Sequence, residues 1–189
     1  MSSSDGNRTH NLPRDLKVIN HLSPSHIDRL IEFSNRDQTI IRFTSDRTRF
    51  ANFEKVSEWL SSSPSLHVLT NEEEVALLGL IWFRPKELDW PAPFDAHSNS
   101  LSITLAKRTY PPARGQGRIV PFFREAVQQY LGSAGYSAST GFWLSTRTQN
   151  KTNIAVNMKL GFKVVGTHSD DTFMSATAAD MMNALRIIA

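Results

Sequence analysis

The chain has 189 residues, of which 40% are hydrophobic, 21% are charged and none is cysteine. This length suits one domain, and an aromatic content of 10% indicates a packed core rather than a disordered chain. The lack of cysteine excludes disulfide scaffolds, cysteine nucleophiles, iron–sulfur clusters and thiolate zinc sites. Lysine and arginine exceed aspartate and glutamate by 21 − 18 = 3 charges. Such a mild excess suits an anionic ligand but is too small to indicate nucleic acid by itself.

Residues 1–14 are small or polar apart from Leu12, and they predict a disordered leader ahead of one domain over residues 15–189. The longest apolar run, Val75 to Phe83, has nine residues, whereas a helix that spans a bilayer needs about 20. The first residues carry neither the basic nor the apolar part of a secretory signal. We therefore expect a cytoplasmic protein with no membrane partner.

Hydrophobic periodicity and capping residues define the expected elements. Ser23 and Pro24 open a helix, because serine is a good N-cap and proline suits the first helical position. Asn150 caps a later helix, which Gly161 ends with a left-handed residue. In chain order we expect a strand at 16–19, helices from 24 and at 49–60, strands at 66–69, 75–83 and 100–109, a helix at 117–131, a strand at 142–145, a helix at 150–159, strands at 162–167 and 172–176, and a last helix after Thr177. This order predicts a mixed sheet with helices in a single α/β domain.

The most informative segment runs from Thr109 to Ile119, with the sequence Thr-Tyr-Pro-Pro-Ala-Arg-Gly-Gln-Gly-Arg-Ile. A strand leads into a glycine turn that opens a helix, whose first amides lack partners within the helix and attract anions. Arg114 and Arg118 add positive charge beside these amides. The segment is not a P-loop, because no Gly-Lys-Ser/Thr follows, nor a dinucleotide fingerprint, because the third glycine is missing. By itself it leaves open an ordinary glycine turn.

Residues 114–119, Arg-Gly-Gln-Gly-Arg-Ile, resemble the acetyl-CoA pyrophosphate loop of the GNAT superfamily of N-acetyltransferases, whose pattern is Gln/Arg-x-x-Gly-x-Gly/Ala. Upstream, Tyr110-Pro-Pro-Ala113 is similar to the short link that follows the family's fourth strand. Downstream, Asn150 to Phe162 resembles the second motif, an asparagine ahead of a helix that closes with Leu-Gly-Phe. The resemblance covers nearly all of residues 15–189 and implies a GNAT-like domain. Such a domain has a mixed, mostly antiparallel central sheet of about six to seven strands flanked by helices.

The resemblance implies an acyltransferase that moves an acetyl group from acetyl-CoA, its cosubstrate, directly to a primary amine in a ternary complex. The end of the fourth strand would meet the pantetheine arm, the glycine loop the pyrophosphate, and an asparagine the cofactor near the start of its helix. The implied cofactor-binding residues are Lys107, Arg108, Thr109, Arg114, Gly115, Gln116, Gly117, Arg118, Ile119 and Asn150. We expect no metal, because the six histidines are never spaced as ligand pairs.

Candidates for proton transfer are fewer. Asn157 stands where many GNAT members carry a tyrosine that protonates the departing thiolate, and an amide can donate a hydrogen bond there but not a proton. Tyr110 is a candidate to protonate the thiolate in its place, and the alternative is that its ring only packs against the loop. His97 has a suitable pKa to accept the proton of the amine; the alternative is a water chain along Ser102 and Thr104.

The aromatic residues Trp82 and Trp143, with Trp90 and Phe94, are candidates to line an acceptor cleft, together with Ser102 and Thr104. The sequence does not choose between a small-molecule amine and a peptide amine as acceptor, and it leaves a homodimer open.

Two alternatives remain at this stage. The first is an acetyl-CoA-binding module that is catalytically weak or inactive, which Asn157 and Ile119 motivate because both depart from the family pattern. The second is a nucleic-acid-binding domain, which the clustered arginines at positions 42, 47 and 49 would favour. We expect no nucleic-acid partner, since the charge excess is small and no aromatic RNA-binding motif appears.

Overall fold

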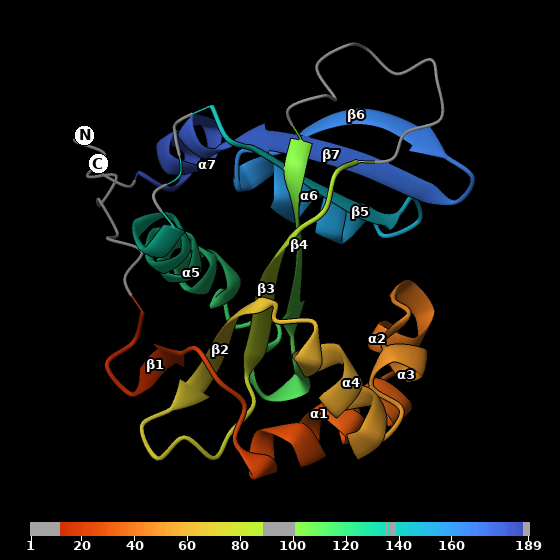
Figure 1. Ribbon diagram of the computed structural model, residues 1–189, viewed down its shortest axis with the longest axis vertical. Helices are drawn as coiled ribbons and strands as arrows, with labels where there is room; N and C mark the ends of the chain where they lie inside the picture. The colour runs from red at the N-terminus through yellow and green to blue at the C-terminus, as the bar shows by residue number, and fades with distance from the viewer. Residues whose placement is uncertain (1–11, 89–100, 135, 137–138, 187–189) are drawn as a thin grey trace, which may run out of the picture.

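A computed structural model describes residues 12–88, 101–134, 136 and 139–186. Within these residues, the strands form one sheet in the order β1-β2-β3-β4-β5-β7-β6, with helices on both faces (Figure 1). The strands are β1 (Leu16–Ile19), β2 (Ser65–Asn71), β3 (Gly79–Pro85), β4 (Leu101–Thr109), β5 (Gly141–Arg147), β6 (Lys163–His168) and β7 (Asp171–Thr177). Neighbouring strands are antiparallel except β4 and β5, which are parallel. The predicted mixed, mostly antiparallel sheet is therefore confirmed.

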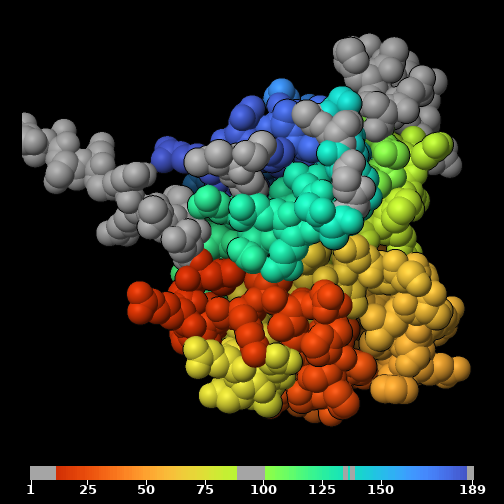
Figure 2. All heavy atoms as spheres, turned by 60° about the vertical axis from the view of Figure 1, so that its left-hand side comes forward, coloured from red at the N-terminus to blue at the C-terminus, as the bar shows by residue number. Residues whose placement is uncertain are grey.

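The helices divide between the two faces of the sheet. They are α1 (Pro24–Arg36), α2 (Gln38–Phe43), α3 (Asp46–Arg49), α4 (Phe53–Ser61), α5 (Ile119–Ala134), α6 (Lys151–Lys159) and α7 (Ala178–Leu185), with a 3-10 turn at Pro111–Ala113. One buried cluster joins α1 to α4 to the sheet face that carries Leu80 and Trp82; the other joins α5 to α7 to the face that carries Ile81 and Phe83. Figure 2 shows α5 crossing the visible surface between the N-terminal and C-terminal parts. None of the helices in the described ranges is long and apolar enough to cross a membrane.

The helix ends follow the predicted capping residues. The Ser23 hydroxyl accepts the amide of His26, whose ring accepts the amide of Ser23 in return, so a histidine completes the capping box of α1. Asn150 caps α6 by accepting the amide of Asn153 at 3.1 Å. Gly161 ends that helix with a φ of +94°, a value that L-residues rarely adopt.

Two predicted boundaries are wrong, for local reasons. The expected helix over 49–60 begins only at Phe53, as α4, because the Asn52 side chain caps it by accepting the amide of Lys55 at 2.9 Å. Arg49 instead ends the short helix α3, and the sequence patterns predicted neither α3 nor α2. The expected strand over 75–83 begins at Gly79. The side chain of Asn71 accepts the amides of residues 75 and 76 and holds them in a turn.

The parallel pairing of β4 with β5 is short. It joins Leu101 to Gly141, Ile103 to Phe142 and Thr104 to Trp143, and then stops. Each strand continues for several residues beyond this point, and the glycine loop follows β4 while α6 follows β5 (Figure 1). The sheet therefore opens between its fourth and fifth strands, on the side of the glycine loop.

The end of α6 provides a test of this architecture. A Cβ at Gly161 would lie 2.7 Å from the carbonyl oxygen of Asp180, in addition to the cost of its left-handed backbone. We expect Gly161→Ala to lower the free energy of unfolding by about 2 kcal/mol or more in urea denaturation. Gly132→Ala is the matched control, because a Cβ at this helical position meets nothing within 4 Å. Equal stabilities of the two variants would contradict the close approach of Gly161 to α7.

Candidate functional site

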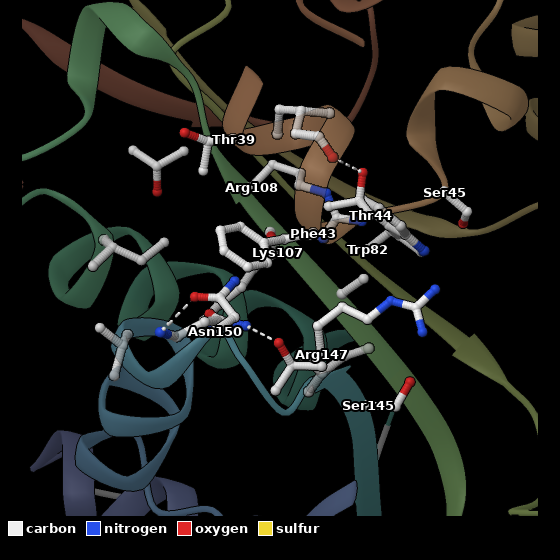
Figure 3. Close-up of a pocket in the computed structure, with 18 of the residues that line it drawn as sticks. Thr39, Phe43, Thr44, Ser45, Trp82, Lys107, Arg108, Ser145, Arg147 and Asn150 are labelled. Carbon is white, nitrogen blue, oxygen red and sulfur yellow. Dashed lines mark hydrogen bonds between the residues drawn. The ribbon is translucent and has the colours of Figure 1, made fainter. Parts of the chain in front are cut away.

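A cavity of about 810 Å³ occupies the opening between β4 and β5. Phe43, Thr44 and Ser45 from the α2–α3 segment border one side, whereas Ser145 and Arg147 of β5 border the other (Figure 3). The cavity reaches from the glycine loop at one end to the tryptophans of β3 and β5 at the other. One continuous space thus joins the two regions that the sequence predicts to bind cofactor and acceptor.

The glycine loop forms an open backbone cradle. Gly115 and Gly117 line the cavity with φ angles of +77° and +71°, and a Cβ at either position would meet no atom within 4 Å. The first amides of α5 follow at Ile119, which also lines the cavity. The side chain of Gln116 turns away and donates to the carbonyl of Pro112 at 2.8 Å. The arrangement leaves room for an anionic group against the amides, which a phosphate or pyrophosphate fits.

The two arginines of the loop differ in their partners. Arg114 is held by Asp37, the N-cap of α2, at 2.5 Å, and it also donates to the carbonyl of Thr109. Burial raises the pKa of Asp37, but Arg114 and the amides of the α2 cap outweigh this effect and lower it, so the pair is charged at neutral pH. Arg118 lines the cavity and forms no ion pair within the described ranges. Arg118 is therefore the loop cation whose charge is available to a ligand.

Lys107 lies at the opening of the sheet and points toward α6. Its Nζ donates to the Oδ1 of Asn153 at 2.8 Å and to the Oδ1 of Asn157. Burial, aided by the neighbouring charge of Arg108, lowers the pKa of Lys107 to about 7. An amine with this pKa exchanges a proton readily at neutral pH. The sequence singled out this residue only for its backbone, and nothing local signalled the side-chain chemistry.

Asn157 does not reach the cavity itself. Its side chain is completely buried, where it accepts from Lys107 and donates to the sulfur of Met174 at 3.7 Å. The family resemblance assigns a proton donor to this position. Here it is occupied by Asn157, which accepts a hydrogen bond from the ammonium group of Lys107.

The other predicted proton carriers are placed differently. Tyr110 is fully buried, stacks on Phe33 with 5.0 Å between ring centroids, and is not part of the cavity lining. Burial raises the pKa of its hydroxyl, so the group is a poor acid at neutral pH. Thr104 lines the cavity, but Ser102 is exposed outside it. His97, like Trp90 and Phe94, lies outside the described residues.

Two tryptophans border the end of the cavity that the sequence predicts to bind the acceptor. Trp82 packs edge-on against Trp59, with 5.5 Å between centroids, and carries the guanidinium of Arg108 at 5.1 Å from its ring centre. Trp143 donates its Nε1–H to the carbonyl of Lys86 at 2.8 Å, and the ammonium of Lys86 lies 5.6 Å from the ring centre. Trp82 and Trp143, two of the three predicted tryptophans, thus line the cavity together with cations.

A buried ion pair fixes this end of the cavity, and sequence reasoning missed it. Asp46 of α3 is completely buried and accepts from Arg108 of β4 at 2.5 and 3.0 Å and from Arg49 at 2.9 Å. Burial by itself raises the pKa of Asp46, but the two guanidinium groups reverse the shift and keep the carboxylate ionised. Its neighbours in sequence are polar or basic, and the partner in β4 is 62 residues away.

No protein-family model matches the sequence, and a search of curated proteins found no match. Solved structures do match. A spermidine N-acetyltransferase from Vibrio cholerae in complex with CoA and spermine has a TM-score of 0.67 at 12% identity, over 90% of this chain and 100% of the other. An acetyltransferase of the GNAT family from Streptococcus pneumoniae has a TM-score of 0.61 at 15% identity, over 86% and 98%. The chain has the GNAT fold.

An uncharacterized protein from Bacillus halodurans also matches, with a TM-score of 0.69 at 16% identity over 90% of this chain and 88% of the other. All three matches extend along most of both chains.

The ion pair between α3 and β4 can be tested without any ligand. Asp46→Asn leaves the buried guanidinium of Arg108 without a countercharge, and loss of one member of a buried pair costs about 3–5 kcal/mol. We expect the free energy of unfolding in urea to fall by about 3 kcal/mol or more. Asp28→Asn, at an exposed position of α1, serves as control and should change it by less than about 0.5 kcal/mol. A stable Asp46→Asn protein would show that the pair does not hold α3 on the sheet.

Proposed function

We propose that this protein is an N-acetyltransferase that transfers an acetyl group from acetyl-CoA directly to a primary amine within a ternary complex. One observation carries the proposal: a single cavity joins a glycine cradle at the N-terminus of α5 to an aromatic and polar wall, through the opening between β4 and β5. The Vibrio cholerae structure of the same fold contains CoA and spermine. A cavity that extends from the glycine loop to the tryptophans suits two substrates bound side by side.

The chain's own groups divide the binding of acetyl-CoA between them. The amides at the start of α5, the open backbone of Gly115 and Gly117, and the charge of Arg118 would hold the pyrophosphate. The stretch of β4 beyond Thr104 no longer pairs with β5, so its edge can bind the amides of the pantetheine arm. Asn150 lines the cavity at the start of α6. The residues present fit the cosubstrate.

The cofactor end is tested by a thermal shift. Acetyl-CoA should raise the melting temperature, because a ligand that binds only the folded state stabilises it by mass action. Arg118→Glu should remove most of this shift, because it places a carboxylate against the pyrophosphate. Arg124→Glu makes the same charge change on α5, away from the cavity lining, and should keep the shift. An unchanged shift in Arg118→Glu would assign the pyrophosphate elsewhere, and no shift in the unmodified protein would contradict acetyl-CoA binding.

Lys107 is proposed as the acid of the reaction. The attacking amine forms a bond to the acetyl carbon and the carbon–sulfur bond breaks. The nitrogen of the new amide gives its surplus proton to solvent water, and the sulfur leaves with the electron pair and needs a proton. The ammonium of Lys107, held by two asparagine oxygens at the opening of the sheet, supplies that proton. Its pKa of about 7 lies below that of an ordinary lysine, which makes it the stronger proton donor. Asn157 is then a positioning residue.

The pH dependence of turnover tests this role. The proton donor is charged below pH 7 and neutral above it, so turnover should decline as the pH rises through about 7. Lys107→Met should lower turnover by about 10- to 100-fold and abolish this alkaline decline, while the acetyl-CoA thermal shift persists. Lys159→Met, at an exposed position at the end of α6, should retain both turnover and profile. An unchanged profile in Lys107→Met would contradict the assignment, and acetyl-CoA binding without release of thiol for any amine would support the inactive binding module instead.

A further inference from the structure

Three guanidinium groups surround Trp82 at the acceptor end of the cavity. In the register of β3 and β4, Trp82 lies opposite Ala106, Arg84 opposite Thr104, and Arg108 opposite Leu80. Because side chains alternate between the faces of a sheet, Arg84 and Arg108 share the face of Trp82 and flank it on either side. Arg49 of α3 covers the same ring from the helical layer, 5.6 Å from its centre.

This cluster carries an unbalanced charge. The buried carboxylate of Asp46 pairs with Arg108 and Arg49. Three guanidinium groups and one carboxylate therefore leave the cluster with two positive charges. Burial and the like charges of Arg108 and Arg84 lower the pKa of Arg49, against the opposing effect of Asp46. Like charges gathered at a partly buried site are unfavourable unless an anion joins them.

Arg84 has the most spare donor capacity. Its Nη2 donates to the hydroxyl of Ser62, and no ion pair of Arg84 occurs within the described residues. Its Nε is buried and has no hydrogen-bond partner in that part of the chain. Arg84 lines the cavity, and the planar fork of a guanidinium matches the two oxygens of a carboxylate.

Acidic groups that could attract a cationic acceptor are scarce in the same space. Among the described residues that line the cavity, Asp171 alone is acidic, and Arg147 lies 3.4 Å from it. Spermine, bound in the Vibrio cholerae structure, is a polycation. A polycation would place ammonium groups beside the guanidinium groups of Arg49 and Arg84, and like charges held close together are destabilising.

We infer that the acceptor of this enzyme is a primary amine that also carries a carboxylate, as a free amino acid does, and that Arg84 and Arg49 beside Trp82 bind this carboxylate. The inference rests on the proposed transferase function and names its substrate class. The tryptophan between the two cations supplies an apolar surface for the rest of the acceptor.

The test compares amino acids with the amines that result from removing their carboxylate. L-phenylalanine with 2-phenylethylamine, and L-leucine with 3-methylbutylamine, form matched pairs, and spermidine represents the polycations. Release of CoA thiol gives kcat/KM for each. We expect each amino acid to exceed its decarboxylated partner by about tenfold or more, as one charge-assisted hydrogen bond allows. Spermidine should be the poorest acceptor of the panel.

Arg84→Met is the decisive variant, since it removes a guanidinium without leaving a buried carboxylate unpaired. It should lower kcat/KM for the amino acid about tenfold and change that for the decarboxylated amine little. Arg124→Met removes a guanidinium from α5 and should leave both values unchanged. Equal use of both members of a pair, a preference for spermidine, or an undiminished preference in Arg84→Met would overturn the inference while the transferase function stands. If none of the amines causes release of CoA thiol, the transferase function itself is overturned, and this inference with it.

Discussion

The architecture of the site depends on the place where β4 and β5 stop pairing. Parallel strands that remained paired to their ends would close the sheet, and every backbone group between them would be satisfied. Here the pairing ends at Thr104 and Trp143, although both strands continue. The edges beyond this point retain free hydrogen-bonding groups that need partners. The cavity, the glycine loop after β4 and the start of α6 after β5 are all positioned by this divergence.

The second constraint is the burial of charge. Asp46 and Arg108 connect a four-residue helix to the central sheet, whereas the other main neighbours of this helix are α1, α2 and α4. A buried carboxylate has to be paired, so α3 stays over β4, and Arg49 is carried to the face of Trp82. The contact that joins α3 to the sheet therefore also determines the charge around Trp82.

Asn157 holds the side chain of Lys107 at the position where the family resemblance implies a proton donor. An amide at Asn157 cannot supply a proton, but it can accept a hydrogen bond from a lysine on the facing strand. Together with Asn153 it holds the Lys107 nitrogen on the α6 side of β4, where burial and the charge of the adjacent residue Arg108 weaken its hold on a proton. The chemistry of the pair belongs to neither residue alone.

The sequence by itself determined the α/β class, the order of the strands and of the longer helices without α2 and α3, the caps at Ser23, Asn150 and Thr177, and the glycine loop. These features depend on local patterns: side-chain periodicity, capping hydrogen bonds within a few residues, and left-handed glycines. Only the tertiary structure decided the opening of the sheet, the lowered pKa of Lys107 and the arginine cluster around Trp82. Each of these depends on contacts between residues dozens of positions apart, as in Lys107 with Asn157 or Asp46 with Arg108. Electrostatic interaction and desolvation act through space, so a group's charge and pKa are set only when the folded chain has chosen its neighbours.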